Sequence, residues 1–228
     1  MKNALFIIAV YLLCFINELH AQHFDAGLNL GTLVSDVQGT DTRDYDNDFE
    51  KVGFTGGVFV NRTFGRNDIL QLEINYTQKG AEQLPDSTNN GYFKMVLNYV
   101  EVPLLLRHRI RVNMNKKFYN NFEWELGISG GYLFSYTYNV SGYNLLLDRS
   151  NLNFIDLNAL LGINYVFSRN WYFGVRYSNS VIPVIKRNAI PAQALTSYPL
   201  AFNNGNNRMV QFCLKYVFGS GNRRGFQE

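Results

Sequence analysis

The chain has 228 residues and a net charge of +3, and 17% of its residues are charged. So mild a charge, without a dense basic cluster, excludes a nucleic-acid-binding protein. The length suits one domain, and no stretch of apolar residues is long enough for a transmembrane helix.

The start of the chain has the pattern of a secretory signal peptide. Lys2 precedes a short apolar run, and Ala21 is a small residue at a suitable cleavage position. The run is too short to span a bilayer as a helix. We therefore expect residues 1–21 to be removed and residues 22–228 to form the mature domain. Cys213 is the one cysteine left in it, so no internal disulfide is expected.

Alternation with a period of two dominates the rest of the sequence. In residues 70–77, LQLEINYT, large apolar residues alternate strictly with polar ones. The same pattern recurs in residues 122–138, 155–167, 171–178 and 208–218. Period two over such lengths is typical of β-strands, and these stretches show no competing apolar pattern with the 3.6-residue period of a helix.

The pattern predicts eight strands in chain order. They span about 23–34, 52–64, 69–80, 93–110, 119–139, 152–167, 170–181 and 207–218. Short links near 65–68, 111–118 and 168–170 alternate with long links at 35–51, 81–92, 140–151 and 182–206. An even number of strands joined in this way is typical of an outer-membrane barrel. The predicted fold is therefore all-β, an eight-stranded antiparallel closed transmembrane β-barrel that ends at about residue 218 and is followed by a short C-terminal tail.

The apolar face of these strands is unusually aromatic. A soluble sheet that turned this face to water would carry few large aromatic residues. Aromatic residues also gather near the strand ends, where membrane barrels carry interfacial girdles. These residues are Phe64, Tyr136, Tyr138, Tyr165, Phe167, Trp171, Tyr216 and Phe218. The main structural alternative, a soluble lipocalin-like barrel, would turn its apolar residues inward.

The opposite face carries charges that would point into the barrel. They are Glu73, Glu101, Glu123, Glu125, Asp156, Arg107, Arg109, Arg176 and Lys215. An eight-stranded barrel is just wide enough for side chains to fill it. Unpaired buried charges are costly, so we expect these side chains to pair with one another. The interior is then a polar core, neither a catalytic site nor a wide channel.

Glycine and proline add two local expectations. Gly27, Gly31, Gly57 and Gly127 would make room for long inward side chains or permit the barrel to bend. Pro103 lacks the N–H that a central strand needs, so a β-bulge is expected there.

The stretch LNYVEVPLLLRHRI at 97–110 resembles a hallmark of the PorT-like outer-membrane β-barrel proteins of Bacteroidota. Further similar stretches are AGLNLG (26–31), INYTQKGA (74–81), GVRYSNSVIPV (174–184) and the ending from 206 to 218. The resemblance implies an outer-membrane barrel without a defined activity. The founding member is associated with the type IX secretion machinery, so a component of a secretion machinery is one alternative role.

No residue is assigned a catalytic, cofactor-binding or metal-ligating role, and no cofactor is expected. In the acidic loop at 36–50, three aspartates have the spacing of a calcium loop. However, Phe49 stands where that loop needs Gly, and Thr55 where it needs Glu. We interpret it as a solvated loop, with weak divalent-cation bridging to lipopolysaccharide as an alternative.

Enzymatic activity has little support in the sequence. A membrane-surface enzyme such as a lipid acyl hydrolase needs a base, and the mature chain offers only His23 and His108. His108 falls in the lipid-facing phase, and no spacing places a nucleophile beside it. The hydrolase is therefore kept as an alternative and not as the main interpretation.

The sequence thus predicts an outer-membrane β-barrel of a Gram-negative bacterium with a structural or protein-interaction role in the envelope. Its expected contacts are outer-membrane lipid and lipopolysaccharide, and not nucleic acid. The loops at 140–151 and 182–206 are rich in apolar residues. They either pack on the protein itself or bind an envelope protein partner.

Overall fold

The computed structural model describes residues 24–38, 51–65, 67–83, 93–110, 121–140, 143–144, 149–186 and 205–218. The expected signal peptide, the tail beyond residue 218 and His23 lie outside these residues, as do most residues of the long loops. No helix in the described part of the chain is long and apolar enough to cross a membrane.

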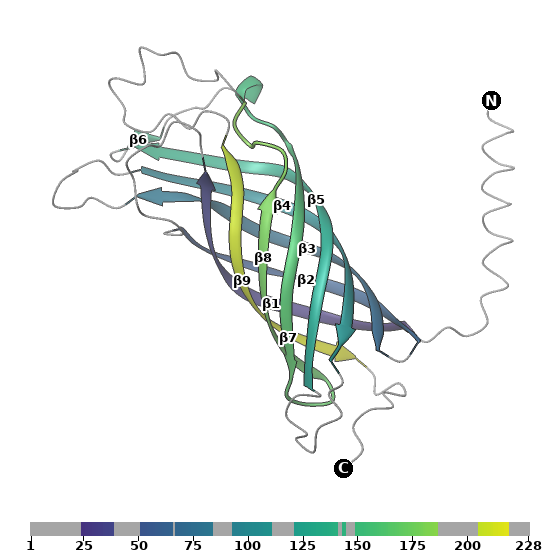
Figure 1. Ribbon diagram of the computed structural model, residues 1–228. Helices are drawn as coiled ribbons and strands as arrows, with labels where there is room; N and C mark the ends of the chain where they lie inside the picture. The colour runs from purple at the N-terminus through teal and green to yellow at the C-terminus, as the bar shows by residue number, and fades with distance from the viewer. Residues whose placement is uncertain are drawn as a thin grey trace, which may run out of the picture.

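The described residues form one closed antiparallel β-barrel (Figure 1). Its strands are β1 (Phe24–Gln38), β2 (Lys51–Phe64), β3 (Asp68–Gln83), β4 (Phe93–Arg109), β5 (Phe122–Val140), β6 (Tyr143–Asn144), β7 (Ile155–Val166), β8 (Trp171–Ser180) and β9 (Asn206–Phe218), and the 3-10 helix η3 (Arg149–Asn151) precedes β7. Neighbouring strands pair in the order β4-β3-β2-β1-β9-β8-β7-β5, and β4 pairs with β5 to close the ring. The two-residue β6 only prolongs the end of β5. The eight predicted strands are confirmed, and β1 and β3 run a few residues further than predicted.

The outer surface of the barrel is an apolar band about as tall as a membrane core. Ten residues separate Asp68 from Gln78 in β3 and His108 from Asn98 in β4, and the outward side chains between them are apolar or aromatic. At about 3.3 Å per residue and a tilt of about 40°, ten residues rise about 25 Å, the height of a barrel's apolar band. Exposed Leu30, Leu72, Leu104, Leu126, Ile163, Phe173 and Leu214 belong to this band.

An aromatic girdle rings the end of the barrel that carries the short turns. Trp171 and Tyr216 lie with ring centroids 4.8 Å apart, and Phe122 and Tyr165 with centroids 5.0 Å apart. His108 also belongs to this girdle. The sequence prediction of an interfacial aromatic band is therefore confirmed at this end.

At the other end, which we call the long-loop end, a bulge in β5 changes which residues face outward. The β4–β5 ladder shifts by one residue between Asn98 and Tyr99, and Phe134 is the extra residue. Beyond it Tyr138 is buried in the interior and Tyr136 packs against the same cluster. The prediction that these two tyrosines belong to the lipid-facing band is therefore wrong.

The predicted bulge at Pro103 is also wrong. The pairs Leu72–Leu104 and Asn75–Glu101 lie in one register, with a gap in the β3–β4 ladder between them. On the β5 side the ladder continues through Pro103. Proline cannot donate to a ladder, and the barrel accommodates it by leaving this gap without inserting a residue.

The expected role of the inward glycines is confirmed by the close approach of their neighbours. A Cβ at Gly57 would lie 2.3 Å from Asn75 Oδ1, and one at Gly27 would lie 2.3 Å from the Phe59 ring. At Gly31 and Gly127 a Cβ would lie 2.2 Å from a carbonyl oxygen of the neighbouring strand. These glycines therefore let inward side chains and strands approach more closely than any other residue would allow.

Candidate functional site

The interior of the barrel is the candidate functional site, because it gathers the charged side chains. Within the described residues the buried charges are five carboxylates and five cations. They are Glu73, Glu101, Glu123, Glu125, Asp156, Lys51, Lys79, Arg107, Arg176 and Lys215. The ammonium of Lys51 donates to Val52 O and to outward-facing Gln78, so it lies outside the network, whereas the partly buried Arg109 pairs with Glu123. With Arg109 counted in place of Lys51, the formal charges of the interior network sum to zero.

Glu125 is the centre of the network in the half of the barrel nearer the short turns. Its carboxylate accepts hydrogen bonds from Arg176 Nε at 2.6 Å, Asn164 Nδ2 at 2.8 Å and Lys215 Nζ at 3.0 Å. Arg176 also donates from both terminal nitrogens to Glu73, at 3.0 and 2.9 Å. Arg176 of β8 therefore joins carboxylates of β3 and β5 across the lumen, with a bidentate pair at one side.

A second group lies still nearer the short turns. Arg107 contacts Glu123 and also donates to Gln71 Oε1 at 2.5 Å, and Arg109 Nε donates to Glu123 at 3.1 Å. The Arg107 guanidinium lies over the Tyr172 ring at 4.9 Å from its centroid. This aromatic contact joins the ion network to an apolar cluster of Phe59, Val166, Tyr172 and Val217 at this end.

The third group lies toward the long-loop end and is built around Lys79. Its ammonium lies 2.6 Å from Glu101 and 3.0 Å from Asp156. Asp156 also accepts hydrogen bonds from Ser180 at 2.5 Å and from Asn207 at 3.1 Å. The lysine thus neutralises one of two facing carboxylates, and hydroxyl and amide groups complete the coordination of Asp156.

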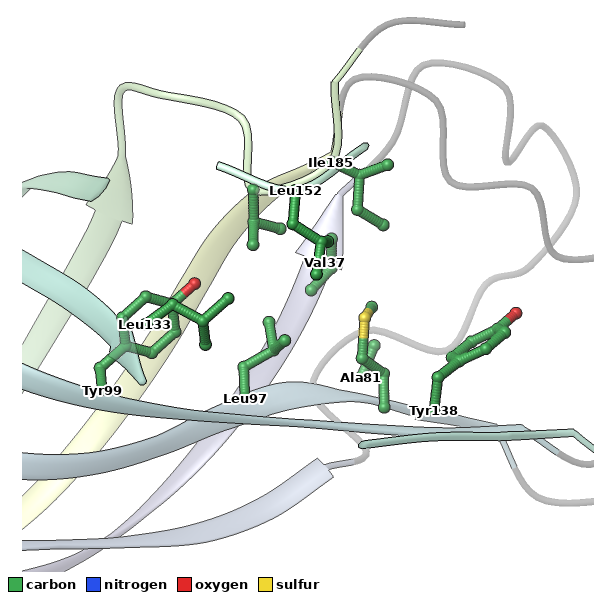
Figure 2. Packing of buried hydrophobic residues seen from close by; sticks show 10 residues of the cluster. Val37, Ala81, Leu97, Tyr99, Leu133, Tyr138, Leu152 and Ile185 are labelled. Atoms are coloured by element: carbon green, nitrogen blue, oxygen red, sulfur yellow. The ribbon is translucent and has the colours of Figure 1, made fainter. Parts of the chain in front are cut away.

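Between Lys79 and the long loops the interior is apolar, and Figure 2 shows the side chains that pack there. The cluster contains Val37, Ala81, Met95, Leu97, Tyr99, Leu133, Tyr138, Leu152, Val184 and Ile185. Leu152 and Ile185 come from the chain segments beside β7 and β8, and they form an isolated antiparallel bridge. Asn153 N donates to Val184 O at 2.8 Å, which fixes the two segments to each other. These segments cover the long-loop end of the lumen as a lid, by which we mean residues 151–154 and 183–186.

The burial of lid residues tests the prediction that the apolar loops either pack on the protein itself or bind a partner. At the start of the 182–206 loop, Val184 and Ile185 are buried against the barrel interior. Self-packing therefore accounts for these two residues. Residues 187–204 and most of 140–151 lie outside the described residues, so partner binding by those parts stays a prediction.

The predicted inward charges are confirmed to lie in the interior and to form ion pairs with one another, and Arg109 is the most exposed of them at 18%. Sequence reasoning missed Lys79 and Tyr99, whereas the alternation had already placed Gln71 and Asn164 on the polar face of their strands. Lys79 shares the inward phase of Glu73, so extending the alternation along β3 would have found it. Lys79 was missed because the predicted strand ended close to it, at about residue 80.

The two alternatives tied to single sites gain no support from the described residues. His108 Nδ1 lies 2.6 Å from Asp68 Oδ1, and its ring lies 5.5 Å from the Trp124 ring. Asp68 is the kind of carboxylate that orients a histidine base, but neither contact supplies the hydroxyl or thiol nucleophile that acyl hydrolysis needs. Of the acidic loop, Asp36 is described, and Arg208 Nη2 donates to it at 3.1 Å. Within the described residues no group of three or more His, Cys, Asp or Glu could hold a metal ion.

Residues 20–186 match the family model described as an outer membrane protein beta-barrel domain. The chain belongs to this family. The barrel therefore lies in the bacterial outer membrane, with its short turns on the periplasmic side and its long-loop end outside the cell. No curated protein matches the sequence.

Several solved outer-membrane barrels are similar to the chain. Ail, the attachment invasion locus protein of Yersinia pestis, is 13% identical with a TM-score of 0.47, covering 85% of this chain and 98% of its own. Neisserial surface protein A is 11% identical with a TM-score of 0.46, covering 86% and 97%. The outer membrane enzyme PagL is 11% identical with a TM-score of 0.30, covering 85% and 99%. None of these similarities assigns an activity to this chain.

Proposed function

We propose that this protein is a non-conducting outer-membrane barrel with a structural or interaction role in the bacterial envelope. The observation that carries the proposal is the filled interior. An apolar cluster occupies each end, and a neutral network of ion pairs joins opposite strands between them. An aqueous channel needs a continuous wet path, and both ends of this lumen are packed with buried apolar side chains.

Recordings in planar lipid bilayers test this proposal, with a general porin as the positive control. We expect the purified barrel to insert and to give no large, steady conductance. A steady conductance comparable to that of the porin would overturn the proposal, because the network and the lid would then have to leave a continuous path.

The proposed contacts are outer-membrane lipid and lipopolysaccharide around the apolar band, and an envelope protein at the extracellular end. Extraction in mild detergent with a tag after Phe218, followed by mass spectrometry, tests for the protein partner. A stoichiometric partner would make the barrel an assembly subunit. Recovery of the barrel alone would restrict its contacts to lipids.

The proposal also includes a narrower family and the mature boundaries. The stretch that resembles PorT-like proteins forms β4, which supplies Glu101 and Arg107 to the interior. This placement supports membership of that group within the larger family. Mass spectrometry of the protein from native membranes should give a mature N-terminus at Gln22, and a chain that retains residues 1–21 would contradict it.

A further inference from the structure

Around the extracellular end of the barrel, two described cations at the level of the membrane surface have an acidic partner. Lys94 pairs with Glu82 at 2.8 Å, and Arg208 pairs with Asp36 at 3.1 Å. Arg149 differs from both. Its side chain is exposed, and no carboxylate of the described residues forms an ion pair with it.

Arg149 is instead held by an aromatic ring. Its guanidinium carbon lies 5.2 Å from the centroid of Phe154, and the Phe154 ring lies 6.4 Å from the ring of lipid-facing Tyr132. A guanidinium stacked on a ring keeps its N–H groups free at the edge, where they can grip an oxyanion with two parallel hydrogen bonds. The aromatic ring also reduces the rotational freedom that Arg149 would lose on binding.

A second cation lies on the neighbouring segment of the lid. Lys186 is exposed, and its backbone N–H donates to Asn151 O at 3.0 Å. Asn151 is two residues from Arg149 in the same 3-10 helix, η3. This backbone hydrogen bond places Lys186 on the chain segment next to η3, the 3-10 helix that begins at Arg149.

The height of this pair identifies what it would meet. Phe167 of the periplasmic girdle directly follows β7 and lies ten residues from Leu157, a distance along the chain that covers the height of the apolar band. Phe154 is three residues further out, so Arg149 lies just above the hydrocarbon core on the extracellular side. Phosphate groups of lipopolysaccharide occupy this level in the outer leaflet.

We propose that Arg149, with Lys186 on the neighbouring segment, binds a phosphate group of lipopolysaccharide at the extracellular rim of the barrel. This inference rests on the proposed function, which takes lipopolysaccharide as a contact of the barrel. Arg149 supplies the fork of N–H donors, Lys186 adds a second positive charge, and Phe154 with Tyr132 forms an aromatic support beside the first sugar and acyl groups.

The test is a titration of the full-length mature barrel in detergent with phosphorylated lipopolysaccharide at low salt. The variant is Arg149→Glu, and the matched control is Arg169→Glu, an exposed arginine in the periplasmic turn. We expect Arg149→Glu to weaken binding about tenfold or more, as for the loss of a charged hydrogen-bonded pair. Arg169→Glu should bind as the wild type does. Mobility on gels with and without boiling verifies that each variant is folded.

Two further titrants separate the sources of phosphate. Lipopolysaccharide stripped of its phosphates should bind the wild type and Arg149→Glu equally. Pyrophosphate alone should bind far more weakly than the lipid, and equal affinity would overturn the assignment to lipopolysaccharide. Unchanged binding by Arg149→Glu would overturn the site itself. The proposed function is tested separately, by conductance in bilayers. A barrel that does not conduct and binds no phosphate through Arg149 would refute the phosphate site and leave the proposed function intact.

Discussion

In its membrane half β4 buries Glu101 and Arg107 beside Leu105, whereas the buried side chains at its extracellular end are all apolar or aromatic. In the membrane half, Leu104 faces outward and Arg107 faces inward, whereas at the extracellular end Lys94 faces outward and Leu97 is fully buried inside. The kind of side chain that β4 turns inward therefore changes along its length, although the whole strand stays in the barrel wall. The reversal follows what lies outside the wall. Around Leu104 the surroundings are lipid, so polar groups must turn inward.

Around Lys94 the strand has passed the apolar band and meets water. The interior there follows the rule of soluble proteins, with apolar side chains inside and charges outside. Along its axis the barrel thus has an ionic core inside the membrane, a large apolar core above it and a small apolar cluster at the periplasmic end. The comparison teaches that inward polarity is a property of membrane depth and not of the barrel as a whole.

The largest effect should come from breaking the ionic core at its centre. Glu125→Ala leaves Arg176 and Lys215 without the carboxylate that they share, and stranded buried charges cost about 3 to 5 kcal/mol. Urea unfolding in lipid vesicles, followed by tryptophan fluorescence, measures the loss. Adding Lys215→Met removes one stranded cation and should restore part of the stability. A double variant less stable than the two single changes predict would contradict the shared-carboxylate account.

The apolar core should respond like the core of a soluble protein. Leu97→Ala creates a cavity among buried side chains, so we expect a loss of about 3 kcal/mol in the free energy of unfolding. The matched control is Thr137→Ala, an exposed outward position at the same end, which should change stability by less than about 0.5 kcal/mol. If the two variants were equally stable, the extracellular end would not be a packed core.

A smaller effect tests how tightly the ionic core is packed. A Cβ at Gly162 would lie 2.8 Å from both Glu125 Oε1 and the Val175 carbonyl oxygen, so Gly162→Ala should cost about 1 to 3 kcal/mol. At lipid-facing Gly130 the nearest atom would be 3.9 Å away. Gly130→Ala should therefore be close to neutral in the same unfolding experiment. Similar losses at both glycines would mean that strand geometry, and not contact with Glu125, sets the cost.

The alternation of residues was enough to predict the strands and the inward charges. Arg176 and Glu125 could be placed inside because each lies in a long run of strict period two. The fold class followed from the same signal, since the alternating link lengths fixed the order of the strands around the ring.

What the pattern could not supply is the register between strands. The contact of Arg176 with Glu73 joins residues 103 positions apart in the sequence, and it depends on the barrel's stagger. The bulge at Phe134 could not be predicted from the pattern either. Tyr136 and Tyr138 continue the alternation in the sequence, but the extra residue turns their side chains to the other face of the strand. The reversal above the membrane was missed for a related reason: Leu97 and Leu133 are apolar residues in an inward phase that was assumed to be polar throughout.

The smallest expected effect is at the outward pair of Lys94 and Glu82, and it tests where the membrane ends. The Lys94 side chain is 41% exposed, so its ion pair is screened by solvent, and Lys94→Ala should cost less than about 1 kcal/mol. Unfolding at low and high salt gives the sharper readout, because a water-exposed pair loses even this contribution as salt rises. A loss above about 2 kcal/mol, independent of salt, would place this pair in a dry environment. The extracellular end of β4 would then not have left the membrane, and the solvent-based reason for the buried Leu97 would fail with it.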